Sequence, residues 1–353
     1  MKFILLMLGI TSCLFNCSNP NTTLYVGTYT NGDSEGIYQF QFNTETGELS
    51  NKHLAATSEN PSFLTYSPDK KHIYAVNENE NGAITSFKVE KEGNLTSLNT
   101  VSVNGAHPCH VTINDSGDKI VVSNYTGGNA SLHSVLNSGL LTEAFQVLDH
   151  NIDSIASHVH SAQFFKNDLF ISDLGRNAVY QYKLKDNLYT LKSPSIIEIQ
   201  DNPGPRHFSI SKNGAFIYII NEYGSSITSV KKTDNGFKQI DSDSTLDENY
   251  KGKNFCADIH LSKDERFLYG SNRGENSIVV FKRNTETGTI DKIQNISTHG
   301  DWPRNFTLDP TGKFMLVANQ NSANISVFKI DPKTGKLSFL HAIDLPSPVC
   351  LLF

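Results

Sequence analysis

An all-β propeller of seven blades, with four antiparallel strands in each blade, is the fold that this sequence predicts. A unit of about fifty residues recurs along the chain, it carries strand patterns without helical periodicity, and the two chain ends complement each other. A fixed period of this length filled with short strands is typical of radial β arrays.

The unit is clearest in residues 303–329, PRNFTLDPTGKFMLVANQNSANISVFK. Phe306 and Leu308 alternate with polar neighbours in a first strand, and residues 309–312 (DPTG) supply turn chemistry. A nearly continuous apolar strand follows at residues 314–318, and a third strand begins after the next turn. Turns such as ETGEL and KTGKL then introduce a fourth strand.

The polar residue that closes each second strand gives the period. Successive separations are 47, 49, 48, 51 and 47 residues in the series Asn77, Asn124, Asp173, Asn221, Asn272 and Asn319. Because an asparagine recurs in nearly every unit, we interpret these asparagines as backbone-capping residues at strand ends rather than as catalytic groups.

The chain ends predict how the ring closes. Residues 24–30 (LYVGTYT) resemble a second strand without a first, and residues 346–353 (PSPVCLLF) resemble a first strand without a second. Joining them completes the seventh blade and removes the open sheet edges.

Composition limits the class of protein. The chain has 353 residues, of which 38% are hydrophobic and 19% charged, and its net charge is −6 without a basic cluster. This argues against nucleic acid as a partner. Nothing between residues 21 and 353 resembles a linker, so we expect one propeller domain over residues 18–353, acting as a monomer.

Residues 1–17 are interpreted as an export signal. Lys2 precedes an apolar run at residues 3–10, and Ile10-Thr11-Ser12-Cys13 resembles a bacterial lipoprotein signal whose cysteine is acylated after cleavage. Cys17 is a poorer candidate, since Asn16 is bulkier than the small residue expected there. The alternatives are a plain cleaved signal or an uncleaved apolar tail on a cytoplasmic protein. We expect a periplasmic or membrane-anchored protein that contacts the membrane only through this lipid.

The other three cysteines, Cys109, Cys256 and Cys350, lie near the start of first strands in three different units. An odd number spread around a ring does not predict a disulfide framework or a metal cluster. We expect small buried side chains that line the channel.

Strand direction predicts where the chemistry lies. In an antiparallel blade, the residues that open first strands and those that close second strands converge on one mouth of the channel. That mouth collects histidine, arginine and carboxylate groups, whereas the other receives turns, so the first mouth is the predicted small-molecule site. The candidates are His110, His158, His160, Asp173, Arg206, Glu222, Arg273 and Arg304.

The candidate residues have competing interpretations. Arg206 and Arg304 each follow a proline, and a guanidinium suits an anion or oxyanion, or it could bond carbonyls of a neighbouring blade. Glu222 closes a very apolar strand and could serve as a general base or pair with an arginine. His158 and His160 point the same way along a strand. They could form half of a metal site, but the arginines would repel a cation, so no metal or other cofactor is expected.

Several blocks resemble the seven-bladed propeller lactonase family, whose best-known activity is 6-phosphogluconolactonase and which includes a fungal muconate lactonizing relative. They are HPCHVTINDSGDKIVVSNYTGGN, SHVHSAQF, DLGRNAVYQYKL, GPRHFSIS, IINE, SNRGENSIVVF, WPRNFTLDPTGKFMLVANQNSANISVF and PVCLLF, within residues 24–353. The resemblance implies that the site is lined by His158, His160, Arg206, Glu222, Arg273 and Arg304. One departure is Ser157, where the family usually has proline.

The expected function is hydrolysis of a sugar lactone to its aldonic acid. Glu222 or His160 would take a proton from water, and Arg206 would stabilise the oxyanion. Arg273 and Arg304 would hold a phosphate or other anionic end, and His110, His158 and Asp173 would add binding contacts. A phosphorylated lactone is a cytoplasmic metabolite, so an exported member could act on an unphosphorylated one. The alternatives are a cycloisomerase or lyase using the same base, and a non-enzymatic propeller that docks a glycan or protein.

Overall fold

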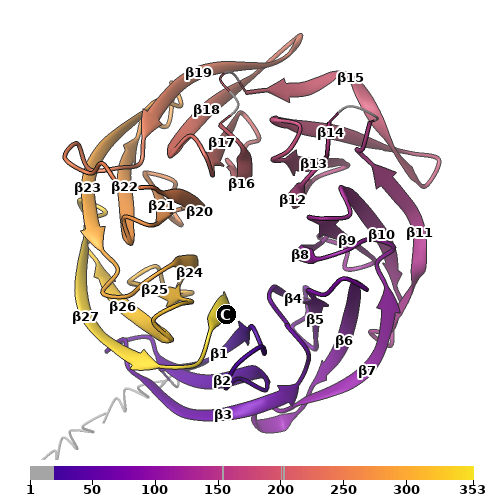
Figure 1. Ribbon diagram of the computed structural model, residues 1–353, viewed down its shortest axis with the longest axis horizontal. Coiled ribbons are helices and arrows are strands. Elements are labelled where there is room, and N and C mark those ends of the chain that lie inside the picture. The colour runs from indigo at the N-terminus through magenta and orange to yellow at the C-terminus, as the bar shows by residue number, and fades with distance from the viewer. Residues whose placement is uncertain (1–19, 153–154, 200, 202) are drawn as a thin grey trace, which may run out of the picture.

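Seven four-stranded antiparallel sheets surround a central axis in the computed structural model, which describes residues 20–152, 155–199, 201 and 203–353 (Figure 1). Within these residues the regular structure is strand, apart from one short 3-10 helix, η1 (Lys91–Gly93), in a turn. The sheets follow one another around the ring as the blades of a propeller, which confirms the predicted fold.

Six blades are continuous in sequence, and each runs from an innermost first strand to an outermost fourth strand. Blades 1 and 2 are β4 (Leu64–Tyr66), β5 (His72–Asn77), β6 (Ala83–Val89), β7 (Leu95–Ser102), and β8 (Pro108–Ile113), β9 (Lys119–Asn124), β10 (Asn129–Val135), β11 (Leu141–Asp149). Blades 3 and 4 are β12 (Val159–Phe165), β13 (Asp168–Asp173), β14 (Ala178–Lys185), β15 (Leu188–Glu198), and β16 (Pro205–Ile210), β17 (Phe216–Asn221), β18 (Ser226–Thr233), β19 (Gly236–Ser244). Blades 5 and 6 are β20 (Phe255–Leu261), β21 (Phe267–Arg273), β22 (Ser277–Arg283), β23 (Ile290–Ser297), and β24 (Pro303–Leu308), β25 (Phe314–Asn319), β26 (Asn324–Ile330), β27 (Leu337–Asp344).

Blade 7 joins the two ends of the chain. Its strands are β28 (Pro348–Leu352), β1 (Asn21–Thr28), β2 (Gly36–Asn43) and β3 (Leu49–Thr57). The last strand of the chain pairs antiparallel with the first, and Tyr25 lies opposite Leu352. The predicted closure is therefore confirmed, and the first sheet meets the last without an open edge.

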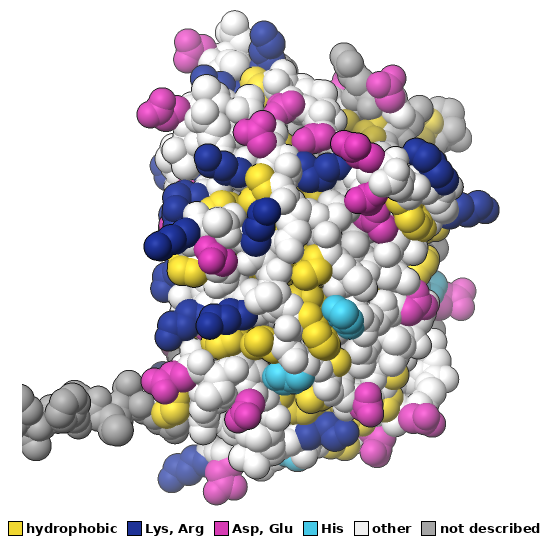
Figure 2. Space-filling view, turned by 90° about the vertical axis from the view of Figure 1, so that its left-hand side faces the viewer, with side chains coloured by type: hydrophobic (Ala, Val, Ile, Leu, Met, Phe, Trp, Pro, Cys, Tyr) yellow, Lys and Arg dark blue, Asp and Glu magenta, His cyan; other side chains and the backbone are white. Residues whose placement is uncertain are grey.

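Burial falls from the axis outward, and this explains the strand patterns. All six residues of β17 and of β25 are buried, because these second strands lie between adjacent blades on both faces. The fourth strands are more exposed, and in β27 Leu337 alone is buried while the other positions are exposed or partly exposed. The outer wall around β23 and β27 carries basic, acidic and apolar side chains interspersed (Figure 2).

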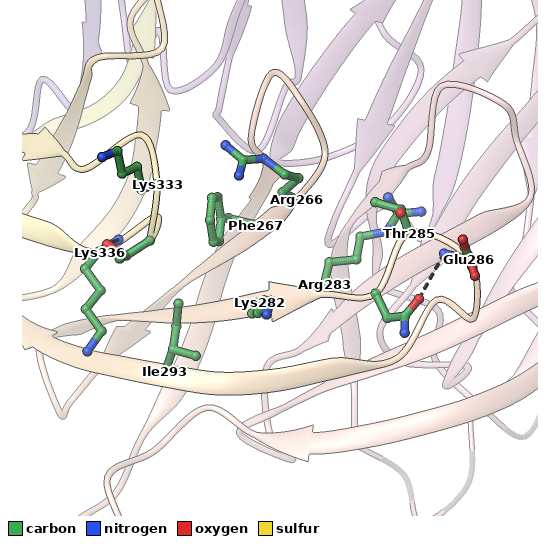
Figure 3. Close-up of a pocket in the computed structure, with 11 residues that line it drawn as sticks. Arg266, Phe267, Lys282, Arg283, Thr285, Glu286, Ile293, Lys333 and Lys336 are labelled. Carbon is green, nitrogen blue, oxygen red and sulfur yellow. Dashed lines mark hydrogen bonds between the residues drawn. The ribbon is translucent and has the colours of Figure 1, made fainter.

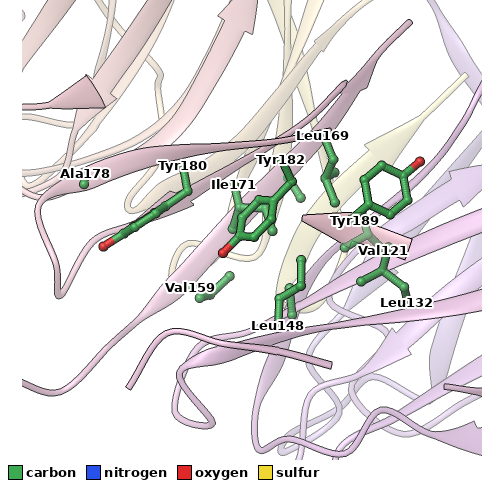
Figure 4. Packing of buried hydrophobic residues seen from close by; sticks show 12 residues of the cluster. Val121, Leu132, Leu148, Val159, Leu169, Ile171, Ala178, Tyr180, Tyr182 and Tyr189 are labelled. Atoms are coloured by element: carbon green, nitrogen blue, oxygen red, sulfur yellow. The ribbon is translucent and has the colours of Figure 1, made fainter. Parts of the chain in front are cut away.

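The hydrophobic core consists of layers between neighbouring blades. In the layer between blades 2 and 3, Val121 and Leu132 pack with Leu169, Ile171 and Tyr182 (Figure 4). Burial of such a side chain contributes roughly 1.5–3 kcal/mol. A blade lacking a neighbour would expose one whole layer, so the ring stabilises itself as a unit.

The turn sequences at the far mouth are held by their own side chains. Asp309 accepts hydrogen bonds from the backbone N–H of Thr311 and of Phe314, at 2.9 and 2.7 Å. Gly312 has φ +74°, a conformation that favours glycine. These bonds satisfy the turn backbone and let β24 reverse into β25.

The predicted backbone capping is confirmed for three of the five recurring asparagines. The side-chain amides of Asn77, Asn124 and Asn272 donate to the backbone carbonyls of residues 59, 103 and 245, at 2.7, 3.1 and 3.0 Å. The amides of Asn221 and Asn319 instead donate to hydroxyl groups on the third strand of their own blades.

The cysteines of the described chain, Cys109, Cys256 and Cys350, are buried and free, as expected. The predicted signal in residues 1–17, with Cys13 and Cys17, lies outside the described residues. No helix among the residues placed by the structure is long and apolar enough to cross a membrane.

Candidate active site

The strand ends bring Arg206, Glu222 and Arg273 together at one mouth of the channel. Arg206 opens β16, Glu222 follows β17, and Arg273 closes β21 in the next blade. Nε of Arg206 and Nη2 of Arg273 lie 3.0 and 2.9 Å from the same carboxylate oxygen, Oε2 of Glu222. The sequence left two interpretations of Glu222, a general base or a partner of an arginine. The structure shows the ion pair, in which Glu222 has two arginine partners.

Arg206 is the most buried residue of this cluster. Its side chain is 2% exposed, and Nη1 donates to the Ala257 carbonyl at 2.6 Å and lies 3.3 Å from Nε2 of His207. Nε is near Glu222 but is not aligned for a hydrogen bond, so that contact is electrostatic. Burial, followed by the charges of Arg273 and Arg304, lowers the pKa of Arg206 to about 10. The group therefore stays charged at neutral pH.

Arg273 is bonded on several sides. Nε and Nη2 donate to the carbonyls of Phe255 and Cys256, at 3.2 and 3.1 Å, and the guanidinium lies 5.3 Å from the Trp302 ring centroid. Burial lowers the pKa of Arg273, although Glu222 opposes that shift. These contacts make Arg273 a support for Glu222 and leave it poorly placed to bind a substrate anion.

A second cluster contains Arg304, Glu78 and Tyr29. Nη2 of Arg304 lies 3.7 Å from Oε2 of Glu78, and the Tyr29 hydroxyl donates to the same oxygen at 2.8 Å. The guanidinium also lies over the Tyr29 ring, 5.4 Å from its centroid. Burial would lower the pKa of Arg304, but Tyr29 and Glu78 outweigh it and raise the pKa above its ordinary value.

Neither Glu78 nor Tyr29 is among the candidates selected from the sequence. The signal for Tyr29 is its position directly after β1, where the half-strand LYVGTYT reaches the mouth. Arg304 has an electrostatic interaction with Glu78 and with Glu222, so both clusters belong to one site.

Three buried histidines, His110, His160 and His207, form a cluster that contacts Arg206 through His207. The rings of His160 and His110 lie 5.2 and 5.4 Å from the His207 ring. Burial is the main reason why the pKa of His207 falls to about 4 and those of His110 and His160 fall well below the usual value. All three are therefore neutral at physiological pH.

Asp258, which sequence reasoning also missed, lies below His207. It accepts a hydrogen bond from Nδ1 of His207 at 2.8 Å and another from the Asn305 amide at 2.6 Å. Burial opposes ionisation, but the contacts with His260 and His207 hold the pKa of Asp258 well below its usual range. Asp258 thus fixes the tautomer of His207, with Nε2 turned towards Arg206.

His158 and Asp173 belong to the wall of the site. The His158 ring stacks on Tyr125 with centroids 4.6 Å apart, and the His160 ring lies 5.5 Å from the same tyrosine in an edge-on arrangement, so both histidines contact one aromatic ring. The Asp173 carboxylate is buried and accepts from the backbone N–H of His158 at 2.9 Å and from the Ser157 hydroxyl. The departure Ser157 thus supplies a hydroxyl that bonds the buried carboxylate. Asp173 orders the loop that carries His158. Its burial favours this structural role over the substrate contact that the sequence predicts.

Among the residues that the structure describes, no group of three or more His, Cys, Asp or Glu side chains is arranged to hold a metal ion. The mouth presents arginines, carboxylates and neutral histidines, which suit proton transfer and the stabilisation of negative charge.

A large open groove of about 780 Å³ lies elsewhere, between blades 5 and 6 at the turn end (Figure 3). Its lining includes Arg266 and Arg283, but Arg266 pairs with Asp264 and Arg283 donates to the Tyr218 hydroxyl. It lacks the converging acid and base groups of the mouth, so we place the active site at the mouth.

Comparison with known proteins identifies the family of the chain. The chain matches the family model described as lactonase, 7-bladed β-propeller, over residues 23–353. The 6-phosphogluconolactonase of Bacillus subtilis (strain 168) is 31% identical over 341 residues, which cover 93% of this chain and 97% of that protein. The 6-phosphogluconolactonase of Formosa agariphila is 35% identical, with 90% and 95% covered. The solved structure of the periplasmic gluconolactonase of Pseudomonas aeruginosa has a TM-score of 0.88 at 30% identity, with 94% and 98% covered. The chain therefore belongs to the seven-bladed β-propeller lactonase family.

Proposed function

We propose that this protein hydrolyses a sugar lactone to the corresponding aldonic acid. The observation that carries the proposal is the convergence of Arg206, Glu222 and Arg273 with Arg304 and Glu78 at one mouth of the channel. The arginines provide positive charge where a tetrahedral oxyanion would form, and the carboxylates can accept a proton from water. The lactonase family and its 6-phosphogluconolactonase members support the same activity.

In the proposed reaction, water adds to the ring carbonyl and the resulting oxyanion lies against Arg206. This guanidinium keeps its charge at neutral pH, and its contacts with Ala257 and His207 hold its plane before the substrate arrives. A donor that needs no rearrangement stabilises the transition state more than the ground state.

We assign the anionic or most polar end of the substrate to Arg304. Its one ionic contact among the described residues is the 3.7 Å approach to Glu78, whereas Arg273 is bonded by two carbonyls and a carboxylate. Of the two arginines expected to hold this end, Arg304 is the better placed, and Arg273 acts through Glu222.

The proposed substrate is a δ-lactone of an aldonic acid, unphosphorylated if the protein is exported. The two named relatives act on a phosphorylated lactone, and the periplasmic relative is a gluconolactonase. The apolar run and Cys13 in the first seventeen residues favour export with a lipid anchor. We propose that the mature protein lies outside the cytoplasm and acts as a monomer.

A panel of phosphorylated and free lactones tests this function. Acid release would be followed in a pH-stat against the spontaneous opening of each lactone, with purified protein and with heat-denatured protein as control. We expect acceleration of at least one sugar δ-lactone, and the ratio between each free lactone and its 6-phosphate reports the role of Arg304. Rates equal to the background for every lactone would refute the proposal.

A further inference from the structure

The active-site mouth contains two carboxylates in very different surroundings. Glu222 follows β17 in blade 4, and Glu78 follows β5 in blade 1, on the other side of the ring (Figure 1). Their side chains are equally accessible, each 14% exposed. No described residue donates a hydrogen bond to Oε1 of either glutamate, so the difference between them lies at Oε2.

The Glu222 carboxylate is neutralised by two guanidinium groups. Both lie within 3.0 Å of Oε2, and both belong to arginines that are at most 6% exposed. Removal of this carboxylate would leave two buried cations unpaired, which is strongly unfavourable. The environment therefore suits a structural counter-ion that holds Arg206 and Arg273 in place.

The Glu78 carboxylate has one neutral donor and one distant cation. The Tyr29 hydroxyl donates at 2.8 Å, and Arg304 lies 3.7 Å away, beyond hydrogen-bonding distance. The Cys109 thiol also interacts electrostatically with Glu78, and burial raises the pKa of this thiol to about 12, so it carries no charge. The Glu78 carboxylate is thus fixed in orientation and has fewer and more distant cations beside it than Glu222.

His160 is the third group that could accept a proton. It is 4% exposed, lies against His207 and Tyr125, and has Arg206 among its electrostatic partners. Burial and these positive charges disfavour the imidazolium, so the ring binds a proton poorly. A general base must hold the proton for part of the reaction, and the burial and nearby positive charges of His160 oppose protonation of its ring.

We infer that Glu78 is the general base of the hydrolysis, that Tyr29 positions it, and that Glu222 is the counter-ion of Arg206 and Arg273. The inference rests on the proposed lactone hydrolysis. Water oxygen bonds to the carbonyl carbon while one water proton passes to Glu78. The bond between the carbonyl carbon and the ring oxygen then breaks, and the ring oxygen leaves as a hydroxyl group with the proton returned by Glu78. Water and lactone give one hydroxy acid, and the enzyme is regenerated.

Tyr29 acts through Glu78. Burial is the main cause that raises the pKa of Tyr29 above its ordinary value, so the hydroxyl keeps its proton and donates it in the hydrogen bond. A hydrogen bond to a carboxylate favours the ionised form. In Tyr29→Phe the acidic limb of the kcat/KM profile should therefore move to higher pH, whereas a purely structural role would lower activity without moving it.

The test compares Glu78 and Glu222 in the full-length protein with the most active lactone of the panel. We expect Glu78→Gln to lower kcat by about 100- to 10,000-fold with little change in KM, the usual contribution of a general base. Added formate should restore part of the activity of Glu78→Ala, because the small carboxylate can occupy the space left by the side chain. Glu222→Ala should lose activity without rescue by formate. Glu80→Gln, an exposed neighbour, is the matched control and should behave as wild type.

Two results would overturn the inference. One is a Glu78→Gln enzyme with kcat near wild type, and the other is rescue by formate of Glu222→Ala but not of Glu78→Ala. Thermal melts of each variant separate these outcomes from misfolding, and Glu78→Gln keeps an acceptor for Tyr29, so it is the variant expected to fold. A wild-type protein that opens no lactone would refute the proposed function itself, whereas an active wild type with an active Glu78→Gln variant refutes only the base assignment.

Discussion

Arg206 shows how much of the site depends on the shape of a single side chain. Its guanidinium contacts a backbone carbonyl, a histidine nitrogen and a carboxylate at once, at 2.6, 3.3 and 3.0 Å. An ammonium group carries its three donors on one nitrogen, so it cannot place donors at the separate positions that Nε and Nη1 of the guanidinium occupy. The charge alone is therefore insufficient, and the planar arrangement of donors is what places it against the oxyanion.

We predict that Arg206→Lys lowers kcat/KM by about 100- to 1,000-fold, the usual effect of losing one oxyanion donor. Lactone opening would be measured at saturating and low substrate for this variant and for Arg266→Lys, which lies on the groove at the turn end. Arg266→Lys should retain wild-type kinetics. If Arg206→Lys hydrolyses the lactone at a rate close to wild type, the assignment of the oxyanion donor is wrong.

At the scale of strands and loops, the site depends on how first strands begin. Five residues that precede a proline at or near this point have a positive φ between 41° and 71°: Asn60, His107, Gly204, Trp302 and Ser347. Asparagine and glycine adopt this conformation readily, whereas for tryptophan it is uncommon. Because the conformation recurs in five blades, it belongs to the repeat, and at Trp302 it places the ring 5.3 Å from the guanidinium of Arg273.

Blade 3 opens differently, through Ser157 and the buried carboxylate of Asp173. Asp173 receives hydrogen bonds from His150 Nδ1 and from the backbone N–H of His158 and Arg176, in addition to the Ser157 hydroxyl. These bonds tie the loop before β12 to the end of β13. The position of His158 at the mouth follows from this network and not from β12 itself.

We predict that Ser157→Ala removes about 1–3 kcal/mol of stability, because a buried carboxylate loses one of its donors. The loop carrying His158 should loosen, so KM should rise more than kcat falls. Urea unfolding and steady-state kinetics would measure both effects. Ser116→Ala, which removes a similar hydroxyl bond to the exposed Asp118, is the control and should change neither. An unchanged KM in Ser157→Ala would mean that this network supports the blade but not the site.

Strand direction allowed one of the two clusters at the mouth to be predicted from the sequence. Arg206, Glu222 and Arg273 were placed at one mouth because each lies at the start of a first strand or the end of a second strand, and they meet there. Their pairing was not predictable, since a period sets the height of a residue along the axis but not the rotamer of its side chain. Tyr29 was not predicted because β1 lies in the blade that joins both ends of the chain. The residues that surround Tyr29, Glu78 and Arg304, belong to two other blades.

The whole ring also sets the protonation of its centre. Innermost strands of several blades surround His110, His160 and His207, so burial keeps these rings neutral in the folded protein. In the unfolded chain each has a pKa near 6.5. Below that pH the unfolded chain therefore binds protons that the folded protein does not. No single blade could produce this effect.

We predict that stability falls as the pH drops from about 6.5 towards 4. The unfolded state binds protons in this window that the folded state cannot accept, so the free energy of unfolding decreases with pH. A pKa of about 4 for His207 corresponds to about 3 kcal/mol lost when the pH passes below it. His260 opposes the trend, because its pKa is raised and its contribution disappears as the pH rises. Three histidines outweigh one, and Asp258, with a lowered pKa, adds a further loss below its ordinary value near 3.8.

Urea unfolding at pH 7.5, 6.0 and 5.0 measures this dependence, and His207→Gln isolates one contribution. The variant lacks a titratable ring, so its stability should fall less between pH 7.5 and 5.0 than that of the wild type, whatever its stability at pH 7.5. His53→Gln, on the outer strand β3, should leave the slope unchanged. A wild type equally stable at pH 7.5 and 5.0 would contradict the prediction, because burial of three neutral histidines at the centre of the ring requires that acid favours the unfolded chain.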